Sequence, residues 1–424
     1  MDWERVSQPN TDRPYAYEFL NQSQYNYLIF NILTFLARYL TFAGHLNPLE
    51  DMKALFTVIF LLASVSLAVA QAPTTPVDPD TLIRGMGQRF IAGPGAEGLS
   101  VGLFFRGESY SYNFGTVKHG ESILPDSNTQ YELGSISKTF IGYLLAKAIV
   151  ENKVRADDDI RKYLPGKYPN LAYEGHPITL TELANWTSGI PDNLPQLPNS
   201  ITNLKGDSVW FAAEHFNDQV TRKDFFDALQ QVKLDTVPGF KARHSNAAAQ
   251  LLAYVLEKVY GNTYEKLVAR YIFKPLHMDH TVFLAARSSN TLANGYNEKG
   301  TLMPHFNAQA QSASGGISST TTDMLKYLKF LLDKKDPAVV LSERKTVSVD
   351  VYGIAVNWLV YRYDDGYSQV WSDGSTLGFY DFLIIYPELD CGIILLSNEA
   401  SASSYQRLSG FADKIFQKLK TAKP

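Results

Sequence analysis

The spacing of hydrophobic and polar residues changes along the chain. Between Gln71 and Asn152 it predicts a helix, a β-hairpin and a second helix. A proline-rich polar stretch begins at Gln71, and a helix is expected from Thr81. Residues 98–117, GLSVGLFFRGESYSYNFGTV, alternate in polarity and turn at Arg106-Gly107, which is typical of a β-hairpin. Residues 135–152, SISKTFIGYLLAKAIVEN, then place apolar side chains at helical spacing, which predicts a helix with a wide buried face.

The middle of the chain is predicted to be helical, with a long loop. The stretch from Asn185 to Lys205 is rich in Pro, Asn and Gly and is typical of a loop. Thr221 and Asp224 form a capping pair, and Gly261 ends a strongly periodic segment. The predicted helices are Thr179–Thr187, Arg222–Val232, Ala247–Tyr260, Thr263–Ile272 and Thr322–Leu332.

Strand patterns return near Val351 in YGIAVNWLVYR, YSQVW, GFYDFLIIYP and CGIILLSN, and a final helix is expected over Ser403–Lys420. Strands therefore flank a helical centre, which favours an α+β fold. One antiparallel sheet would be built from both chain ends, with an inserted helical region. We assign residues 71–155 and 335–424 to the sheet part of one catalytic domain and residues 156–334 to its helical part.

Composition narrows the classes of partner. The chain has 424 residues, 45% of them hydrophobic and 19% charged, which is enough apolar material for a large core. A net charge of -4 argues against nucleic acid as a partner, because phosphate binding needs a basic surface. The single cysteine, Cys391, excludes an intramolecular disulfide and a cysteine-based zinc site, and its apolar context predicts a packed thiol.

Residues 52–70 have the pattern of a secretory signal peptide. Lys53 precedes an apolar run, and Ala68-Val69-Ala70 offers a cleavage site. We therefore expect a secreted or periplasmic protein with no stable membrane anchor after cleavage. Fifty-one residues precede Met52, so we hypothesise that translation starts at Met52 and that residues 1–51 are a non-native extension. The alternative is that residues 1–51 are a disordered or membrane segment, since they include the apolar stretch YNYLIFNILTFLARYL.

Ser135 and Lys138 form a candidate nucleophile and proton acceptor. Positions i and i+3 of a helix share a face, and a serine hydroxyl needs a neighbouring base to become nucleophilic. The pair is weak evidence alone, because chance also gives Ser342 and Lys345, which we interpret as a solvated turn. Two histidines, His277 and His280, lack the further ligands of a metal site, so we expect them to pack a loop.

Several longer motifs resemble the class C β-lactamases and their relatives among penicillin-binding proteins and serine esterases. They are ELGSISKTF (132–140), ITLTELANWTSGIP (178–191), PGFKARHSNAAAQLLAYVLEKVYG (238–261), SGGISSTTTDM (314–324) and WSDGSTLGFYDFLIIYPE (371–388). The resemblance runs in order from Gly98 to the C-terminus. It implies the β-lactamase/transpeptidase fold, which agrees with the layout predicted from the polarity pattern.

The resemblance also implies roles for individual residues. Ser135 matches the acylated nucleophile, and Lys138 matches the lysine that eases removal of its proton. Asn246 matches the asparagine that positions the substrate amide and the lysine. Gly374 lies in the matched Lys-Thr-Gly motif, and the backbone N–H of Ser375 would complete the oxyanion hole with that of Ser135.

His244 departs from the family, which usually has tyrosine in a Tyr-x-Asn motif. An imidazole with a pKa of about 6.5 is mostly neutral at neutral pH, so His244 could serve as general base and later proton donor. The alternative is that it only fills the space of the tyrosine while Lys138 acts alone.

Ser372 is the second departure, because the family has a lysine or histidine there that meets a substrate carboxylate. Asp373 beside it would repel an anion if it pointed inward. Arg243 could compensate for the missing cation, although we expect it to be an exposed arginine without a role. We infer weaker recognition of β-lactams and a preference for an ester or a neutral peptide-like amide.

The sequence therefore predicts an exported serine hydrolase that acts through an acyl-enzyme on Ser135, without a metal or an organic cofactor. Its expected partner is a small-molecule or peptide substrate with an ester or amide carbonyl. A β-lactamase or a D-peptidase is an alternative within the enzymes. An impaired relative that only binds cell-wall peptide or a partner is the alternative outside them.

Overall fold

The structure of the protein is a computed structural model that describes residues 79–93, 95–284, 291–307 and 309–421. The chain divides into two units, residues 1–77 and 78–424, and every described residue belongs to the second. The predictions for residues 1–51 and for the signal peptide at 52–70 lie outside the described residues.

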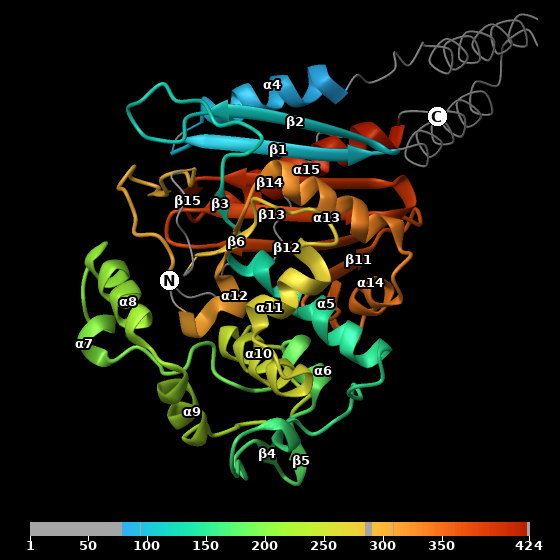
Figure 1. The fold of residues 1–424 in the computed structure, drawn as a ribbon. Helices are drawn as coiled ribbons and strands as arrows, with labels where there is room; N and C mark the ends of the chain where they lie inside the picture. Colours follow the sequence, from blue (N-terminus) through green and yellow to red (C-terminus); the bar gives the residue numbers. More distant parts are fainter. Residues whose placement is uncertain (1–78, 94, 285–290, 308, 422–424) are drawn as a thin grey trace, which may run out of the picture. The chain divides into compact units, whose positions relative to one another are not determined.

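An eight-stranded antiparallel sheet organises the second unit (Figure 1). Its strand order is β2-β1-β14-β13-β12-β11-β10-β9, so the first hairpin pairs with β14, the strand of this sheet that comes last in the chain. The sequence prediction of one sheet built from both chain ends is confirmed. The strands are β1 (Gly98–Phe105), β2 (Glu108–Gly115), β9 (Val347–Val349), β10 (Tyr352–Ile354), β11 (Leu359–Arg362), β12 (Ser368–Ser375), β13 (Tyr380–Tyr386) and β14 (Cys391–Ser397).

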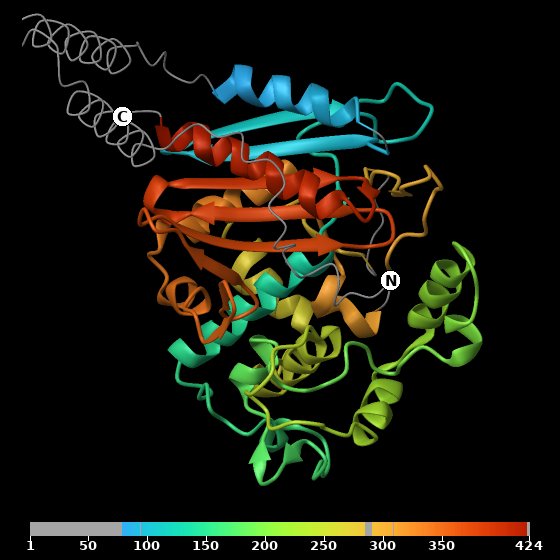
Figure 2. The ribbon, with the colours of Figure 1, turned by 180° about the vertical axis from the view of Figure 1, so that it is seen from behind.

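Helices cover both faces of the sheet. The first and last described helices, α4 (Pro79–Ile91) and α15 (Ser404–Thr421), cover one face, as Figure 2 shows. Helix α13 (Thr321–Asp333) packs on β1 and β14 from the other side. Cys391 is buried in the core beneath α15, so the prediction of a packed thiol is confirmed.

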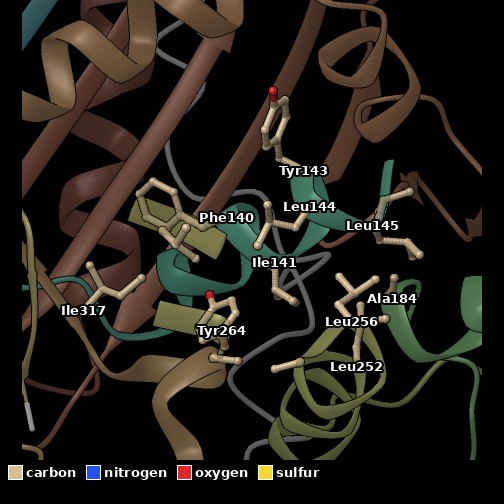
Figure 3. Packing of buried hydrophobic residues seen from close by; sticks show 14 of the residues in the cluster. Phe140, Ile141, Tyr143, Leu144, Leu145, Ala184, Leu252, Leu256, Tyr264 and Ile317 are labelled. Carbon is tan, nitrogen blue, oxygen red and sulfur yellow. The ribbon is translucent and has the colours of Figure 1, made fainter. Parts of the chain in front are cut away.

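Helix α5 (Ser137–Val150) lies at the centre of the helical region, although the sequence analysis assigned it to the sheet part. Ten consecutive residues, Ser137–Ala146, are buried, because sheet and helices surround this part of α5. Figure 3 shows Ile141, Leu144 and Leu145 of α5 against Leu252 and Leu256 of α10 (Asn246–Tyr260). This packing fixes the direction of α5, and therefore the place of the residues at its first turn.

The predicted helices differ from the observed ones mainly at their ends. The pattern over Thr179–Thr187 gives only α6 (Leu180–Ala184), because Trp186 adopts a positive φ of 66° and ends the helical run. Thr221 and Asp224 form the predicted capping box of α9 (Arg222–Gln230), and Gly261 is left-handed at the end of α10.

The sequence analysis missed four α-helices. They are α7 (Asn199–Thr202), which lies within the predicted loop, α8 (Ser208–Gln219), α12 (Ser312–Gly315) and α14 (Pro337–Ser342). Helix α8 buries only Ala213 and Glu214, so it has no continuous apolar stripe to reveal it.

The remaining elements are short. They are α11 (Tyr264–Val268), which continues as a π-helix over Ala269–Phe273, α12 (Ser312–Gly315), α14 (Pro337–Ser342), β3 (Tyr131–Glu132), β4 (Ala172–Tyr173), β5 (His176–Pro177), β6 (Val282–Phe283), β7 (Tyr296–Asn297), β8 (Ile317–Ser319) and β15 (Glu399–Ala400). In the second Ser-x-x-Lys match, Ser342 is fully buried at the end of α14, so the interpretation as a solvated turn is wrong for this residue. It holds for the residues that follow, because Glu343 is in a turn and Arg344 and Lys345 are exposed. The Ser342 hydroxyl donates to the carbonyl of Val339.

Gly142 gives a test of how tightly α5 packs. A Cβ atom added at Gly142 would lie 2.4 Å from the backbone oxygen of Val356, which belongs to a different segment. We expect Gly142→Ala to lower the free energy of unfolding by about 1–3 kcal/mol, because overpacking outweighs the gain in helix propensity. Urea unfolding followed by circular dichroism measures the change.

Gly410 in α15 is the matched control. It is also a helical glycine, and no described atom outside its own helical surroundings lies within 4 Å of an added Cβ. Gly410→Ala should raise the free energy of unfolding by up to about 1 kcal/mol. If the two variants were equally stable, the close packing assigned to α5 would be contradicted.

Candidate active site

Ser135 lies just before α5 and is partly exposed. It is in a single 3₁₀ turn, η1 (Gly134–Ile136), directly before α5, and not in the first turn of the α-helix as the sequence pattern suggested. From Tyr131 to Ala146 it is the one residue that is not buried. A single accessible hydroxyl therefore stands in a rigid, buried segment.

Lys138 is buried against three oxygen atoms. Its Nζ lies 2.7 Å from Ser135 Oγ, 2.7 Å from Asn246 Oδ1 and 2.8 Å from the backbone oxygen of Ser314. Burial lowers the pKa of Lys138 to about 7, although the charges of Asp192 and Asp373 act to raise it. Much of this amine is therefore neutral at neutral pH.

The partners of Lys138 decide where its lone pair points. The amide oxygen of Asn246 and the carbonyl of Ser314 can only accept hydrogen bonds, so they take the two N–H groups of the neutral amine. The remaining lone pair then faces Ser135 Oγ, the one partner that has a proton to give. The arrangement is suited to removing the serine proton.

The first turn of α10 carries Asn246. Ser245 caps this helix, accepting from the N–H of Ala248, and its hydroxyl donates to the carbonyl of Pro191. Asn246 Nδ2 lies 3.3 Å from Asn193 Oδ1, which leaves Asn246 Oδ1 directed at Lys138. The predicted residues Ser135, Lys138 and Asn246 therefore meet through direct hydrogen bonds.

His244 belongs to a different set of contacts. Its Nδ1 lies 2.8 Å from Asp192 Oδ1, and its ring packs edge-to-face on Trp186 with 5.6 Å between centroids. Within the described part of the chain, no hydrogen bond joins the His244 ring directly to Ser135 or Lys138. A catalytic role for His244 stays a prediction.

Asp192 is a residue that the sequence analysis missed. Its Oδ1 also accepts from the backbone N–H of Asn246 at 3.2 Å. Burial raises the pKa of Asp192, but the hydrogen bond and charge of His244, with smaller contributions from Asn246 and Lys138, hold it below its usual range. An aspartate in a proline-rich loop, 52 positions before His244, gives no spacing signal by which it could have been found.

Gly374 and Gly134 allow β12 to touch the turn that carries the serine. A Cβ added at Gly374 would lie 2.0 Å from the carbonyl oxygen of Leu133, and one added at Gly134 would lie 2.5 Å from Ser375 N. Gly134 also needs its positive φ of 48°. Strand and turn are therefore in backbone contact beside Ser135.

The backbone N–H of Ser375 points into this contact region. The N–H of Thr376 bonds to the carbonyl of Phe379, and alternation along an antiparallel pair leaves Ser375 without a bond to β13. Its N–H is directed to the other side, where β11 has ended, since β11 pairs with β12 only as far as Trp371. This is the direction from which η1 approaches.

Ser372 and Asp373 lie on opposite faces of β12. Ser372 is buried on the face of Val370, toward the helical region, while Asp373 is on the face of Trp371 and accepts from Tyr380 Oη at 2.7 Å. Asp373 therefore does not point toward the helical region, and burial raises its pKa. Arg243 contacts Asp235 at 2.6 Å, so it is engaged elsewhere and does not replace the missing cation.

The described residues offer neither a metal site nor a membrane-spanning helix. They contain no group of three or more His, Cys, Asp or Glu side chains arranged to hold a metal ion. They also contain no helix with the length and hydropathy to cross a membrane.

The loop with His277 and His280 is bound to α13, since the His280 N–H donates to Asp323 and the His277 carbonyl accepts from Lys326.

Comparisons with known proteins agree with this geometry. A D-alanyl-D-alanine-carboxypeptidase/endopeptidase, AmpH, of Escherichia coli K12 is 23% identical over 389 residues, which cover 87% of this chain and 97% of that protein. A Beta-lactamase of Yersinia enterocolitica is 24% identical over 374 residues, covering 78% of this chain and 89% of that protein.

A solved structure shows the same fold. The Beta-lactamase/D-alanine Carboxypeptidase of Yersinia pestis, crystallised with citrate, superposes with a TM-score of 0.68 at 22% identity, covering 81% of this chain and 99% of that one. The predicted β-lactamase/transpeptidase-like fold is confirmed. The family model described as Beta-lactamase matches residues 79–413, which include the sheet, α5 and the Ser135–Lys138 pair. The chain therefore belongs to the Beta-lactamase family of serine hydrolases.

Proposed function

We propose that the protein hydrolyses an ester or amide bond through an acyl-enzyme formed on Ser135. The observation that carries this proposal is the buried amine of Lys138, whose lone pair faces the one accessible hydroxyl of its segment. In the first step Ser135 Oγ attacks the substrate carbonyl carbon, and its proton passes to Lys138. Collapse of the tetrahedral intermediate breaks the bond to the leaving group, which takes up the proton from Lys138 and restores the neutral amine.

The N–H groups of Ser135 and Ser375 are proposed to stabilise the negative oxygen of that intermediate. The contact of Gly374 with the η1 turn and the direction of the Ser375 N–H support this assignment. Preorganised N–H donors of this kind are each worth about 10²–10³-fold in rate. Water then attacks the acyl-enzyme and releases the acid, with Lys138 or His244 as the base.

The charges around Ser135 favour a substrate without a carboxylate beside the scissile bond. Ser372 is neutral, Arg243 is engaged with Asp235, and Asp192 adds a negative charge. We therefore propose an ester or a neutral peptide-like amide as the preferred substrate. A D-alanyl peptide or a β-lactam is the second candidate, favoured by the names of the relatives from Escherichia and Yersinia.

Labelling with a fluorophosphonate tests the nucleophile. We expect the probe to modify Ser135, and Ser135→Ala to lose the label and at least about 10³-fold of turnover. Ser137→Ala is the matched control, since its buried hydroxyl has no hydrogen-bond partner among the described residues and the label should be kept. Peptide mass mapping locates the adduct, and an adduct on any other residue would overturn the proposal.

The substrate class follows from turnover of a p-nitrophenyl ester, a chromogenic cephalosporin and a D-alanyl peptide. Ester turnover well above the other two supports the neutral substrate, and rapid cephalosporin turnover contradicts it. A labelled Ser135 with no turnover of any substrate would favour the alternative, a relative that binds cell-wall peptide or a partner without releasing it.

The pKa of Lys138 predicts the acid limb of the pH profile. Acylation needs the neutral amine, so the rate of labelling should rise with pH through about 7 and level off above it. The measurement is the second-order rate constant for fluorophosphonate labelling from pH 5 to 9. Lys138→Ala should remove most of the rate together with this limb. A limb that persisted in that variant would assign the titration to another group.

We also propose that the protein acts outside the cytoplasm, because residues 52–70 have the signal-peptide pattern. Expression in the native host should give a mature chain that begins near Gln71. Intact mass of the purified native protein measures this. A chain that retained Tyr25–Phe42 would contradict both the export proposal and a start at Met52.

A further inference from the structure

Asp192 connects two groups that the proposed reaction uses. Its Oδ1 lies 2.8 Å from His244 Nδ1 and 3.2 Å from the backbone nitrogen of Asn246. Its Oδ2 lies 2.9 Å from Asn193 Nδ2 and, in a long contact, 3.5 Å from Asn246 Nδ2. Both oxygens of one carboxylate are thus surrounded by donors from two segments.

The loop of Asp192 is also fixed to the start of α10. The backbone oxygen of Asp192 accepts from the N–H of Ala247 at 2.9 Å, and the carbonyl of Pro191 accepts from Ser245 Oγ at 2.9 Å. The first N–H groups of a helix carry partial positive charge and favour a carboxylate. These contacts hold Asp192 beside the start of α10, where the N–H groups favour its charged form.

A carboxylate at this position decides the tautomer of His244. An ionised carboxylate can only accept hydrogen bonds, so His244 Nδ1 must carry the proton in the contact with Asp192. When the imidazole is neutral, its lone pair is then on Nε2. The edge-to-face contact with Trp186 restricts the orientation of the ring.

The same carboxylate acts on the orientation of the Asn246 amide together with Asn193, whose Nδ2 donates to Asp192 Oδ2 at 2.9 Å. Asp192 Oδ2 and Asn193 Oδ1 both accept, so the NH₂ group of Asn246 faces them and its oxygen faces Lys138. The flipped amide would place NH₂ against the Lys138 amine, which already needs that oxygen as an acceptor.

We propose that Asp192 is a positioning residue that holds His244 in the Nδ1–H tautomer and Asn246 with its oxygen on Lys138. This inference rests on the proposed function, because it assigns His244 a role in the reaction of Ser135. The tautomer of His244 and the orientation of the Asn246 amide then both depend on the charge of Asp192. Replacing it should disturb both groups at once.

Asp192→Asn is the main test. An amide has one acceptor oxygen, so its NH₂ group must face donors on one side whichever way it turns. We expect kcat for p-nitrophenyl acetate to fall about 10²-fold. Asp235→Asn is the matched control, because Asp235 pairs with Arg243, next to His244, and its loss leaves the contacts of Asp192 intact. Its kcat should be unchanged.

A double-mutant cycle with His244→Phe separates positioning from general damage. If Asp192 acts mainly through the imidazole, Asp192→Asn should cost only a few-fold once His244 is absent. An equal loss in both backgrounds would overturn the coupling to His244. Equal kcat for Asp192→Asn and Asp235→Asn would overturn the whole inference.

The tautomer can be observed without turnover. Nitrogen-15 spectra of histidine-labelled protein at pH 8.5 distinguish Nδ1–H from Nε2–H, and the signal missing in His244→Phe identifies His244 among the eight histidines. We expect the Nδ1–H form in the unmodified protein and its loss in Asp192→Asn. An Nε2–H form in the unmodified protein would overturn the inference. This readout does not depend on the folding of the Asp192→Asn variant.

The pH profile of labelling tests the effect of Asp192 on Lys138. Two charges, Asp192 and Asp373, act on Lys138 and raise its pKa, so removing Asp192 should move the acid limb of labelling to lower pH. The shift should persist in the His244→Phe background, because it reaches Lys138 directly. An unmoved limb would contradict the link between Asp192 and Lys138.

These outcomes are distinguishable from failure of the proposed function. If Ser135→Ala kept its turnover, the acyl-enzyme proposal would fail, whereas the tautomer measurement would still report on Asp192. If Ser135→Ala lost turnover while the Asp192 tests failed, only the positioning role would be withdrawn.

Discussion

The removal of one amine from water is the constraint on which this site depends. Lys138 is buried, and the cost of burying a charge lowers its pKa to about 7. An exposed lysine would stay protonated and would have no lone pair to offer the serine. Burial alone would leave the amine unsatisfied, so the three oxygens around Nζ are equally necessary.

Backbone contact between the sheet and the helical region completes the arrangement. Gly374 and Gly134 let β12 approach the η1 turn more closely than any side chain would permit. Ser135 belongs to the helical side of this contact, and the N–H of Ser375 belongs to the sheet. The two parts of the chain are thus held in register at the point where a substrate carbonyl would lie.

Charge distinguishes this site from the family pattern that its motifs resemble. The cation expected at Ser372 is absent, and Arg243 pairs with Asp235. Asp192 adds a carboxylate next to His244, while Asp373 turns to the opposite face of β12 and bonds to Tyr380. The balance near Ser135 is therefore less positive, which bears on the class of substrate more than on the chemistry of acylation.

The sequence by itself predicted most of the longer elements and the proximity of Ser135 and Lys138. Alternation and helical periodicity are local properties, so they gave the sheet from both chain ends, helix α10 with its terminal Gly261, and the spacing of Ser135 and Lys138. Helix α8, which buries only Ala213 and Glu214, had no local pattern to reveal it. Only the tertiary structure decided the partners of these groups. Asp192 lies 52 positions from His244, and Ser314 lies 176 positions from Lys138. Contacts between such distant residues arise from packing, so no local spacing in the sequence predicts them. Only the tertiary structure decided the pKa of Lys138 as well, because the loss of solvent around its amine depends on every segment that folds around it.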